Sequence, residues 1–238
     1  MNDRRGKNMA VSVRDRLLNL ARERGEDFQL ILTRYGLERL LYRLGKSNYR
    51  DLFILKGAML FMLWGDLAGA RIPIQADIGF GDAVTPDPRS IKFPTLLDSP
   101  APNLKAYPLE TVVAEKYQAL VNLGMANSRM KDFYDLWIIS REFDFNGLTL
   151  SKAIGNTFSR RRTSLSEHVP LGLSPEFYED SHKTTQWNAF VHKGMLAVSP
   201  PTLKDICLSL EDFLSPPTRA LVRDEEFRAN WEPGGPWC

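Results

Sequence analysis

The chain has 238 residues, of which 43% are hydrophobic and 25% are charged, proportions that exclude a disordered or a fibrous protein. It carries 31 Lys and Arg against 29 Asp and Glu, a net charge near +2, which neither requires nor excludes a nucleic-acid partner. A chain of this length can bury a sizeable core, and any basic surface on it must be local.

Cysteine usage and the lack of apolar segments indicate the compartment. The two isolated cysteines, Cys207 and Cys238, form neither a disulfide framework nor a zinc site, which favours a reducing environment. No apolar stretch in the sequence reaches the roughly 20 residues of a membrane span, and no apolar segment of a secretory signal follows the polar residues 1–6. Translation could begin at Met1 or at Met9. The sequence predicts a cytoplasmic protein with no membrane partner.

Two amphipathic helices are expected at the start of the chain. In residues 11–24 and 28–44, apolar side chains recur at intervals of three and four between charged ones, the spacing of a helix with one buried face. Gly45 directly follows the second pattern, and glycine is the residue that most often ends a helix. We therefore expect the second helix to stop there.

A short apolar run follows these helices. Residues 52–55 are Leu-Phe-Ile-Leu and stop at Lys56 and Gly57, after which residues 58–64 resume an apolar pattern. We interpret this order as a strand, a tight turn and a helix, because glycine permits the backbone conformations that tight turns need.

The clearest strand pattern lies in residues 71–80. Apolar side chains alternate there with Pro73, Gln75, Asp77 and Gly79, the period of a strand with one buried face. Asp77 is thereby placed on the polar face. The next segment, residues 81–108, is rich in Pro, Asp and Ser, which predicts loops around one or two brief strands.

The remaining chain is predicted to be mostly helical. The expected helices cover residues 108–123, 132–143, 150–160, 175–180, 183–190 and 202–214. Residues 216–238, where Pro and Gly return, are interpreted as a loosely ordered tail. Helices, two strand segments and then helices again indicate an α+β fold with a small mixed sheet. We expect the domains to be residues 1–104 and 105–215, followed by the tail.

Each candidate functional residue has a simple structural explanation when it is taken alone. Lys56 and Gly57 can form an ordinary turn, and Asp77 can face water from the polar side of its strand. Lys116 can extend along a half-buried helix face, and Asp132 can stabilise the start of a helix through the macrodipole. Only their order along the chain favours a common function.

That order resembles the AbiEii/AbiGii toxin family of nucleotidyltransferases, over roughly residues 17–213. The segments that carry the likeness are FILKGAML (53–60), QADIGFGD (75–82), ETVVAEKYQAL (110–120) and SRMKDFYDLW (128–137). The resemblance implies a nucleotidyltransferase core with added N-terminal helices and a helical C-terminal half. It also implies a nucleoside triphosphate as donor, an RNA acceptor such as tRNA, and a cognate antitoxin as partner.

The resemblance implies a division of roles on the nucleotide side. Lys56 and Gly57 would let backbone N–H groups approach the phosphates at the start of a helix. Lys116 would pair with phosphate as a point charge, and Asp135 would contribute to nucleotide binding.

On the carboxylate side, the resemblance implies that Asp77 binds Mg²⁺ or helps to activate the attacking hydroxyl. Asp132 corresponds to the family's C-terminal acidic motif and would orient the lysine or the nucleotide. These implied roles make Asp77, Lys116 and Asp132 the candidate catalytic residues, with Asp77 as the metal ligand.

The sequence departs from the family pattern at its metal site. The family has an Asp-x-Asp pair on the strand after the helix that follows the glycine turn, whereas here Asp66 is followed two positions later by Ala68. Gly65 favours a turn at that point, and the chain has the pattern of an internal deletion before Arg71. Because Mg²⁺ commonly needs one or two carboxylates besides phosphate and water, Asp77 alone is expected to hold it weakly.

The sequence is therefore compatible with three functions. The first is an active nucleotidyltransferase toxin, and the second is an inactive family member that still binds its antitoxin or a nucleotide. The third is a nucleic-acid-binding module without catalysis, in which the run Arg160, Arg161 and Arg162, with Lys152 and His168 nearby, would contact phosphates. The alternative for that run is a solvated helix end, where basic residues are favoured.

Overall fold

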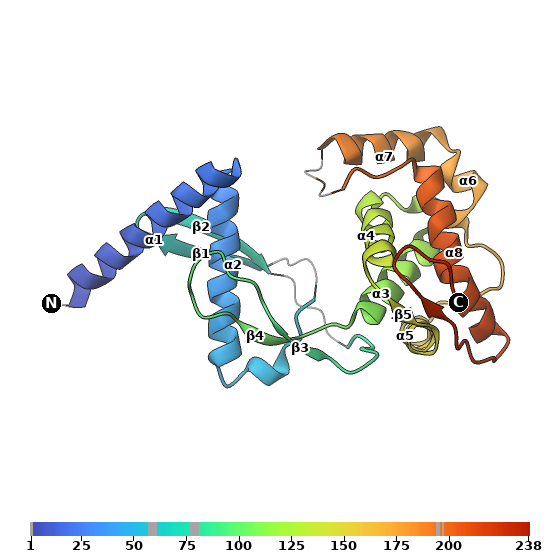
Figure 1. Cartoon of the computed structure of the whole chain (residues 1–238). Helices are drawn as coiled ribbons and strands as arrows, with labels where there is room; N and C mark the ends of the chain where they lie inside the picture. Colours follow the sequence, from blue (N-terminus) through green and yellow to red (C-terminus); the bar gives the residue numbers. More distant parts are fainter. Residues whose placement is uncertain (1, 57–60, 77–80, 194–195, 197) are drawn as a thin grey trace. The chain divides into compact units, whose positions relative to one another are not determined.

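The computed structural model describes residues 2–56, 61–76, 81–193, 196 and 198–238 (Figure 1). Gly57 and Asp77, two of the residues expected to be functional, lie outside the described residues. The chain divides into two compact units. The mixed unit comprises Met1–Gly81 and Pro88–Tyr107, and the helical unit comprises Asp82–Asp87 and Pro108–Cys238.

In its described residues, the mixed unit has two α-helices, one short 3₁₀ helix and two hairpins. Its elements are α1 (Asn2–Arg24), α2 (Phe28–Lys46), the 3₁₀ helix η1 (Arg50–Leu52), β1 (Phe61–Leu67), β2 (Ala70–Ala76), β3 (Arg89–Lys92) and β4 (Asn103–Ala106). The start of α2 is capped by Asp27, whose side chain accepts a hydrogen bond from the backbone N–H of Leu30. The core of the unit joins both helices to β2 through Leu17, Ile31, Leu32, Ile72 and Ile74. The two expected N-terminal helices are confirmed, but α2 does not stop at Gly45 and continues to Lys46.

The segment between η1 and β2 differs from its prediction. A helix was expected over residues 58–64, but β1 occupies Phe61–Leu67 and pairs antiparallel with β2. The turn lies at Ala68 and Gly69, both with positive φ (51° and 82°), rather than at Gly65, which pairs with Ile72 inside the hairpin. The prediction of a helix was wrong because a short apolar run is compatible with either a buried helix or a strand.

The second hairpin confirms the brief strands expected within residues 81–108. Its strands β3 and β4 pair antiparallel, and Leu55 forms an isolated parallel bridge to Ala106. Leu52, expected in a strand, instead ends η1. In the described part of the chain the strands form three two-stranded antiparallel sheets, and helices dominate, so the expected α+β class is confirmed.

The helical unit contains the larger core. Its elements are α3 (Leu109–Leu123), η2 (Gly124–Ala126), α4 (Met130–Glu142), β5 (Phe145–Asn146), α5 (Gly147–Arg160), η3 (Leu171–Leu173), α6 (Pro175–Tyr178), α7 (Ser181–Lys193), α8 (Leu203–Val222) and β6 (Asn230–Trp231). All six helices expected in this half are present. Fully buried Phe133, Phe158, Phe177 and Phe213 lie in one core cluster drawn from α4, α5, α6 and α8.

The C-terminal segment is more ordered than residues 216–238 were expected to be. Helix α8 continues through Pro216 and Pro217 to Val222, and β6 pairs with β5. A proline at 217 has no N–H to offer the carbonyl of Phe213 four residues earlier, and the indole Nε1 of Trp237 donates to that carbonyl at 3.0 Å. The segment is therefore held by a hydrogen bond that the helix itself cannot make.

None of the helices in the described residues is both long enough and apolar enough to cross a membrane.

Candidate functional site

The loop before α4 fixes where that helix begins. The side-chain oxygen of Asn127 accepts the backbone N–H of Arg129 at 2.9 Å, a local contact that favours the turn into the helix. The backbone carbonyl of Asn127 accepts a hydrogen bond of 2.9 Å from Nζ of Lys183, which is buried at the start of α7. The first turn of α4 is thereby held in place, and it contains Asp132.

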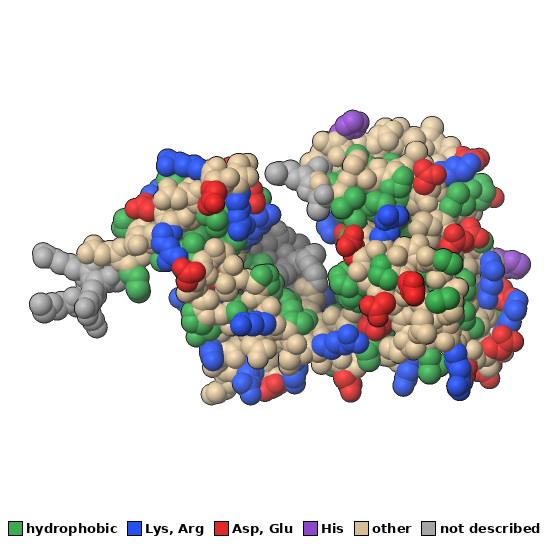
Figure 2. Space-filling view, in the orientation of Figure 1, with side chains coloured by type: hydrophobic (Ala, Val, Ile, Leu, Met, Phe, Trp, Pro, Cys, Tyr) green, Lys and Arg blue, Asp and Glu red, His purple; other side chains and the backbone are tan. Residues whose placement is uncertain are grey.

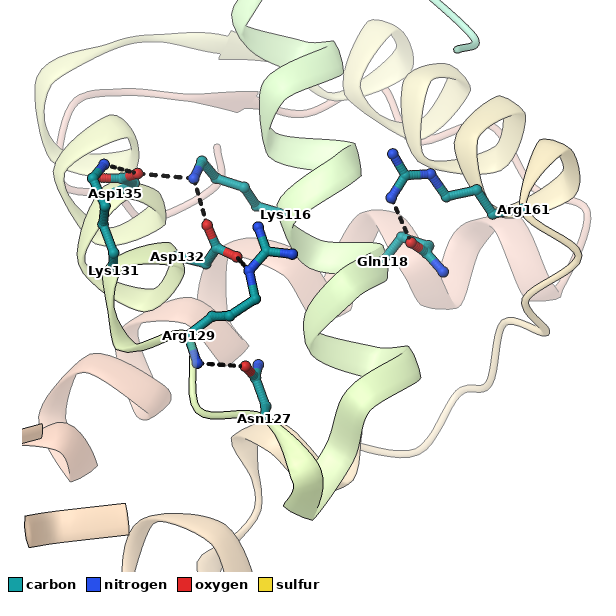
Figure 3. Close-up of polar contacts among 8 residues, drawn as sticks. All are labelled: Lys116, Gln118, Asn127, Arg129, Lys131, Asp132, Asp135 and Arg161. Atoms are coloured by element: carbon teal, nitrogen blue, oxygen red, sulfur yellow. Dashed lines mark hydrogen bonds and ion pairs between the residues drawn. The ribbon is translucent and has the colours of Figure 1, made fainter. Parts of the chain in front are cut away.

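Lys116 on α3 lies against the start of α4 (Figure 3). Its Nζ donates to Oδ1 of Asp132 at 2.6 Å and to Oδ2 of Asp135 at 2.8 Å. The side chain of Asp132 is only 5% exposed, whereas those of Lys116 and Asp135 are each 20% exposed. The lysine is therefore fixed between two carboxylates at a partly open position.

Two further cations flank these carboxylates. Arg129 Nε lies 2.7 Å from Oδ2 of Asp132, three residues along the helix, in an ion-pair contact. This Oδ2 atom is buried and accepts no well-aligned hydrogen bond, so the contact is electrostatic rather than directional. Lys131 Nζ lies 2.6 Å from Oδ2 of Asp135, four residues along. The side chains of Arg129 and Lys131 are 58% and 72% exposed.

The cluster carries an excess of positive charge, since three cations surround two carboxylates. Burial alone lowers the pKa of Lys116, but its hydrogen bonds to Asp132 and Asp135 outweigh this effect and raise the pKa above the ordinary value. Lys116 therefore stays charged at neutral pH. A partly open, net positive cluster suits an anion such as a phosphate group.

Lys116, Asp132 and Asp135 were expected to belong to one site, and the structure places them in direct contact. Asp132 is buried and paired with Lys116, so it is more than an exposed carboxylate at a helix start. Lys56 belongs to the mixed unit, where its Nζ lies 5.4 Å from the centroid of the Tyr107 ring. The structure describes each unit by itself and does not describe Gly57 or Asp77.

A comparison with protein-family models gives one decisive match. The model described as "Nucleotidyl transferase AbiEii toxin, Type IV TA system" matches residues 66–214, more than half of the chain. The chain belongs to the AbiEii toxin family. Comparisons with curated proteins and with solved structures gave no match.

The matched region covers Asp77, Lys116, Asp132 and Asp135 but begins ten residues after Lys56. The expected resemblance to this family is thus confirmed, and with it a role as a toxin with a cognate antitoxin. The lysine–aspartate cluster is the part of the AbiEii-matched region whose geometry the structure describes.

Arg129 and Lys131 were not among the residues expected to have a functional role. Their spacing contained the signal, because residues three and four apart on a helix are neighbours. Arg129 with Asp132, and Lys131 with Asp135, have this spacing once residues 130–142 are taken as one helix. In this AbiEii chain both cations join the same cluster.

Nucleotidyl transfer commonly uses a divalent metal, so a catalytic site is expected to offer ligands for an ion such as Mg²⁺. Among the described residues, no three His, Cys, Asp or Glu side chains gather as metal ligands would. Asp132 and Asp135 already contact cations at 2.6 to 2.8 Å. A divalent ion there would lie among three positive charges, so these residues do not fit Mg²⁺.

The first hairpin explains the role of Asp66 in this AbiEii chain. Its Oδ1 accepts the backbone N–H of Gly69 at 3.2 Å, across the turn between β1 and β2. Asp66 is the only acidic residue in the sequence of either strand. The side chain therefore stabilises a tight hairpin, as aspartate often does in turns, and has no Asp-x-Asp partner.

Proposed function

We propose that this AbiEii-family toxin acts in the cytoplasm and transfers a nucleotide from a nucleoside triphosphate to a hydroxyl group of RNA, such as tRNA. The family match supports the reaction class. The observation that supports the site is the position of Lys116, paired with Asp132 and Asp135 and flanked by two exposed cations.

In the proposed reaction the acceptor oxygen bonds to the α-phosphorus, the bond from that phosphorus to the bridging oxygen breaks, and pyrophosphate leaves with the negative charge. Lys116 would contact the phosphates as a fixed point charge, because Asp132 restrains it. Arg129 and Lys131 would turn from their carboxylates toward the incoming triphosphate, since both are largely exposed. We propose that the carboxylate of Asp77 accepts the proton of the attacking hydroxyl group.

The test is transfer of label from each of the four NTPs to total tRNA by the purified chain, with magnesium or manganese present. Lys116→Ala should lose at least tenfold in rate, since a positioned charge on phosphate is removed. Lys204→Ala is the matched control, because Lys204 also contacts a carboxylate but lies on α8 and is 55% exposed. Equal rates in the wild-type and Lys116→Ala chains would refute the assigned role.

A second candidate function is an inactive toxin relative that retains antitoxin or nucleotide binding. The hairpin favours it, because Asp66 is used in the turn and its strands carry no Asp-x-Asp pair. The same assay separates the two candidates. Absence of transfer with all four NTPs, together with NTP binding that Lys116→Ala abolishes, would support the inactive relative.

The structure offers less support for a nucleic-acid module built on Arg160, Arg161 and Arg162. Nη1 of Arg161 donates to Oε1 of Gln118 at 2.9 Å, and its Nη2 lies 3.4 Å from Glu115 and 3.6 Å from Asp82. This guanidinium is engaged within the helical unit and partly neutralised there.

A further inference from the structure

The two units carry opposite charge, although the whole chain is nearly neutral. The mixed unit contains 17 Lys and Arg against 10 Asp and Glu, whereas the helical unit contains 14 against 19. A charge asymmetry of this kind is typical of proteins with one unit that contacts a polyanion. The excess of cations makes the mixed unit the one suited to contact a polyanion.

Exposed apolar side chains concentrate just after α2 in that unit. Leu52 is 76% exposed and Tyr49 is 64% exposed, which makes them two of the three most exposed large apolar side chains among the described residues. Phe53, beside them, is 38% exposed. A single exposed apolar residue needs no explanation, but three within five positions indicate a contact surface.

Basic side chains surround these residues. Lys46 ends α2 and Arg50 begins η1, and both are exposed. Asp51 is the acidic residue of this segment, and it is shared between Arg50, at 3.3 Å, and Lys105, at 3.1 Å. In Figure 2, Lys and Arg side chains gather around this end of α2, with few acidic ones among them.

A polar pocket of about 350 Å³ opens on the same surface. It is lined by Gly45, Lys46, Ser47, Asn48, Arg50 and Asp51, which flank Tyr49. Basic residues at the last turn of α2 are explained by the helix dipole alone. That explanation does not extend to Tyr49, Leu52 and Phe53, which follow the helix and leave apolar faces in water.

We propose that Lys46, Tyr49, Arg50, Leu52 and Phe53, named here the α2-end surface, bind a single-stranded segment of the RNA acceptor. This inference rests on the proposed function, because RNA is named as the ligand on the ground that it is the proposed acceptor. Cations beside exposed rings suit single-stranded nucleic acid, because the cations contact the phosphates while bases stack on the rings. A duplex would hide its bases, and an acidic peptide would use the cations but not the rings.

The test measures binding of a fluorescently labelled, unstructured 12-nucleotide RNA to the full chain by anisotropy, without any NTP. The variants are Tyr49→Ala and Arg50→Ala. Tyr49→Ala should weaken binding about tenfold, the loss of one stacked base. Arg50→Ala should lower the slope of log affinity against log salt by about 0.7, the value for one phosphate contact in a single strand.

The matched control is Arg228→Ala. Arg228 contacts Glu226 two residues away, as Arg50 contacts its neighbour Asp51, but it lies in the helical unit and is 78% exposed. Its removal should leave both affinity and slope unchanged. Circular dichroism of each variant checks the fold, and Lys46→Ala provides a second cation variant with the same expected change in slope.

Three outcomes would overturn the proposal: no binding at about 50 mM salt, equal effects of Arg50→Ala and Arg228→Ala, or equal binding of poly-glutamate and RNA. Tighter binding of the DNA strand of the same sequence would also contradict it. The assay contains no NTP, so a failure here is distinct from a failure of the transfer reaction. Conversely, Lys116→Ala should lose transfer while its RNA binding is unchanged.

Discussion

The Nζ atom of Lys116 on α3 lies 2.6 Å from Oδ1 of Asp132 on α4, and this contact joins two helices at a buried carboxylate. Removal of the lysine leaves Asp132 with Arg129, whose side chain is largely exposed and whose contact is poorly directed. A buried charge that loses its partner destabilises the fold, usually by more than the pair itself contributes. The pair thus stabilises the fold, in addition to the role proposed for it at the phosphates.

Lys116→Met should therefore lower the free energy of unfolding by about 1–3 kcal/mol, and Asp132→Asn in the same chain should recover part of that loss. The measurement is a double-mutant cycle by urea unfolding, followed by tryptophan fluorescence. Four of the five tryptophans lie in the helical unit, so the signal reports mainly on it. Strictly additive effects of the two substitutions would show that the pair is not coupled.

The same pair predicts a dependence of stability on alkaline pH. The pKa of Lys116 is higher in the folded chain than its ordinary value of 10.5, so the folded state holds this proton more tightly. The stabilisation is fully present below pH of about 10 and is lost as the pH rises through the folded pKa. The difference in unfolding free energy between wild-type and Lys116→Met should be constant from pH 7 to about 9.5 and then shrink. A difference that grows above pH 10 would contradict the raised pKa.

The two cysteines should differ in reactivity, because one is buried in α8 and the other is exposed near the C-terminus. Cys207 is fully buried in the helical core, and burial raises the pKa of its thiol to about 12, so it should resist thiol reagents in the native chain. Cys238 is exposed. Titration with a chromogenic disulfide at pH 8 should modify one thiol per chain in buffer and two in urea.

Cys238→Ser is the control for that titration, since it should leave no reactive thiol in the native protein. Rapid native modification of Cys207 would show that α8 opens far more easily than its packing indicates.

Part of this molecule could be predicted from its sequence, because long periodic segments identify helices well. The lysine–aspartate cluster could also be predicted from the sequence, because Asp132 and Asp135 are close on one helix and Lys116 belongs to a helix expected just before it. The register of the first hairpin could not be predicted from the sequence. An apolar run such as residues 61–64 has no period of its own, and only the pairing of β1 with β2 decides its conformation.

The C-terminal segment escaped prediction for another reason. Pro216 and Pro217 remove two helical N–H donors, which normally ends a helix. Here the missing donor for the carbonyl of Phe213 comes from Trp237, twenty-four residues later. Such a long-range replacement leaves no local pattern in the sequence. The tail is also fixed to α4, where Trp231 Nε1 and the backbone N–H of Gly234 donate to the carbonyl of Ser140 at 2.6 and 3.0 Å.

The hydrogen bond from Trp237 should contribute most to stability while residue 217 is proline. Trp237→Phe keeps a ring against Phe213 but removes the donor, which should lower the free energy of unfolding by about 1–3 kcal/mol. In a Pro217→Ala chain, the N–H of residue 217 can bond the Phe213 carbonyl within the helix, so the same substitution should cost about 1 kcal/mol less. Urea unfolding of the four chains measures this coupling. An equal cost of Trp237→Phe in both backgrounds would show that Trp237 stabilises α8 by packing alone.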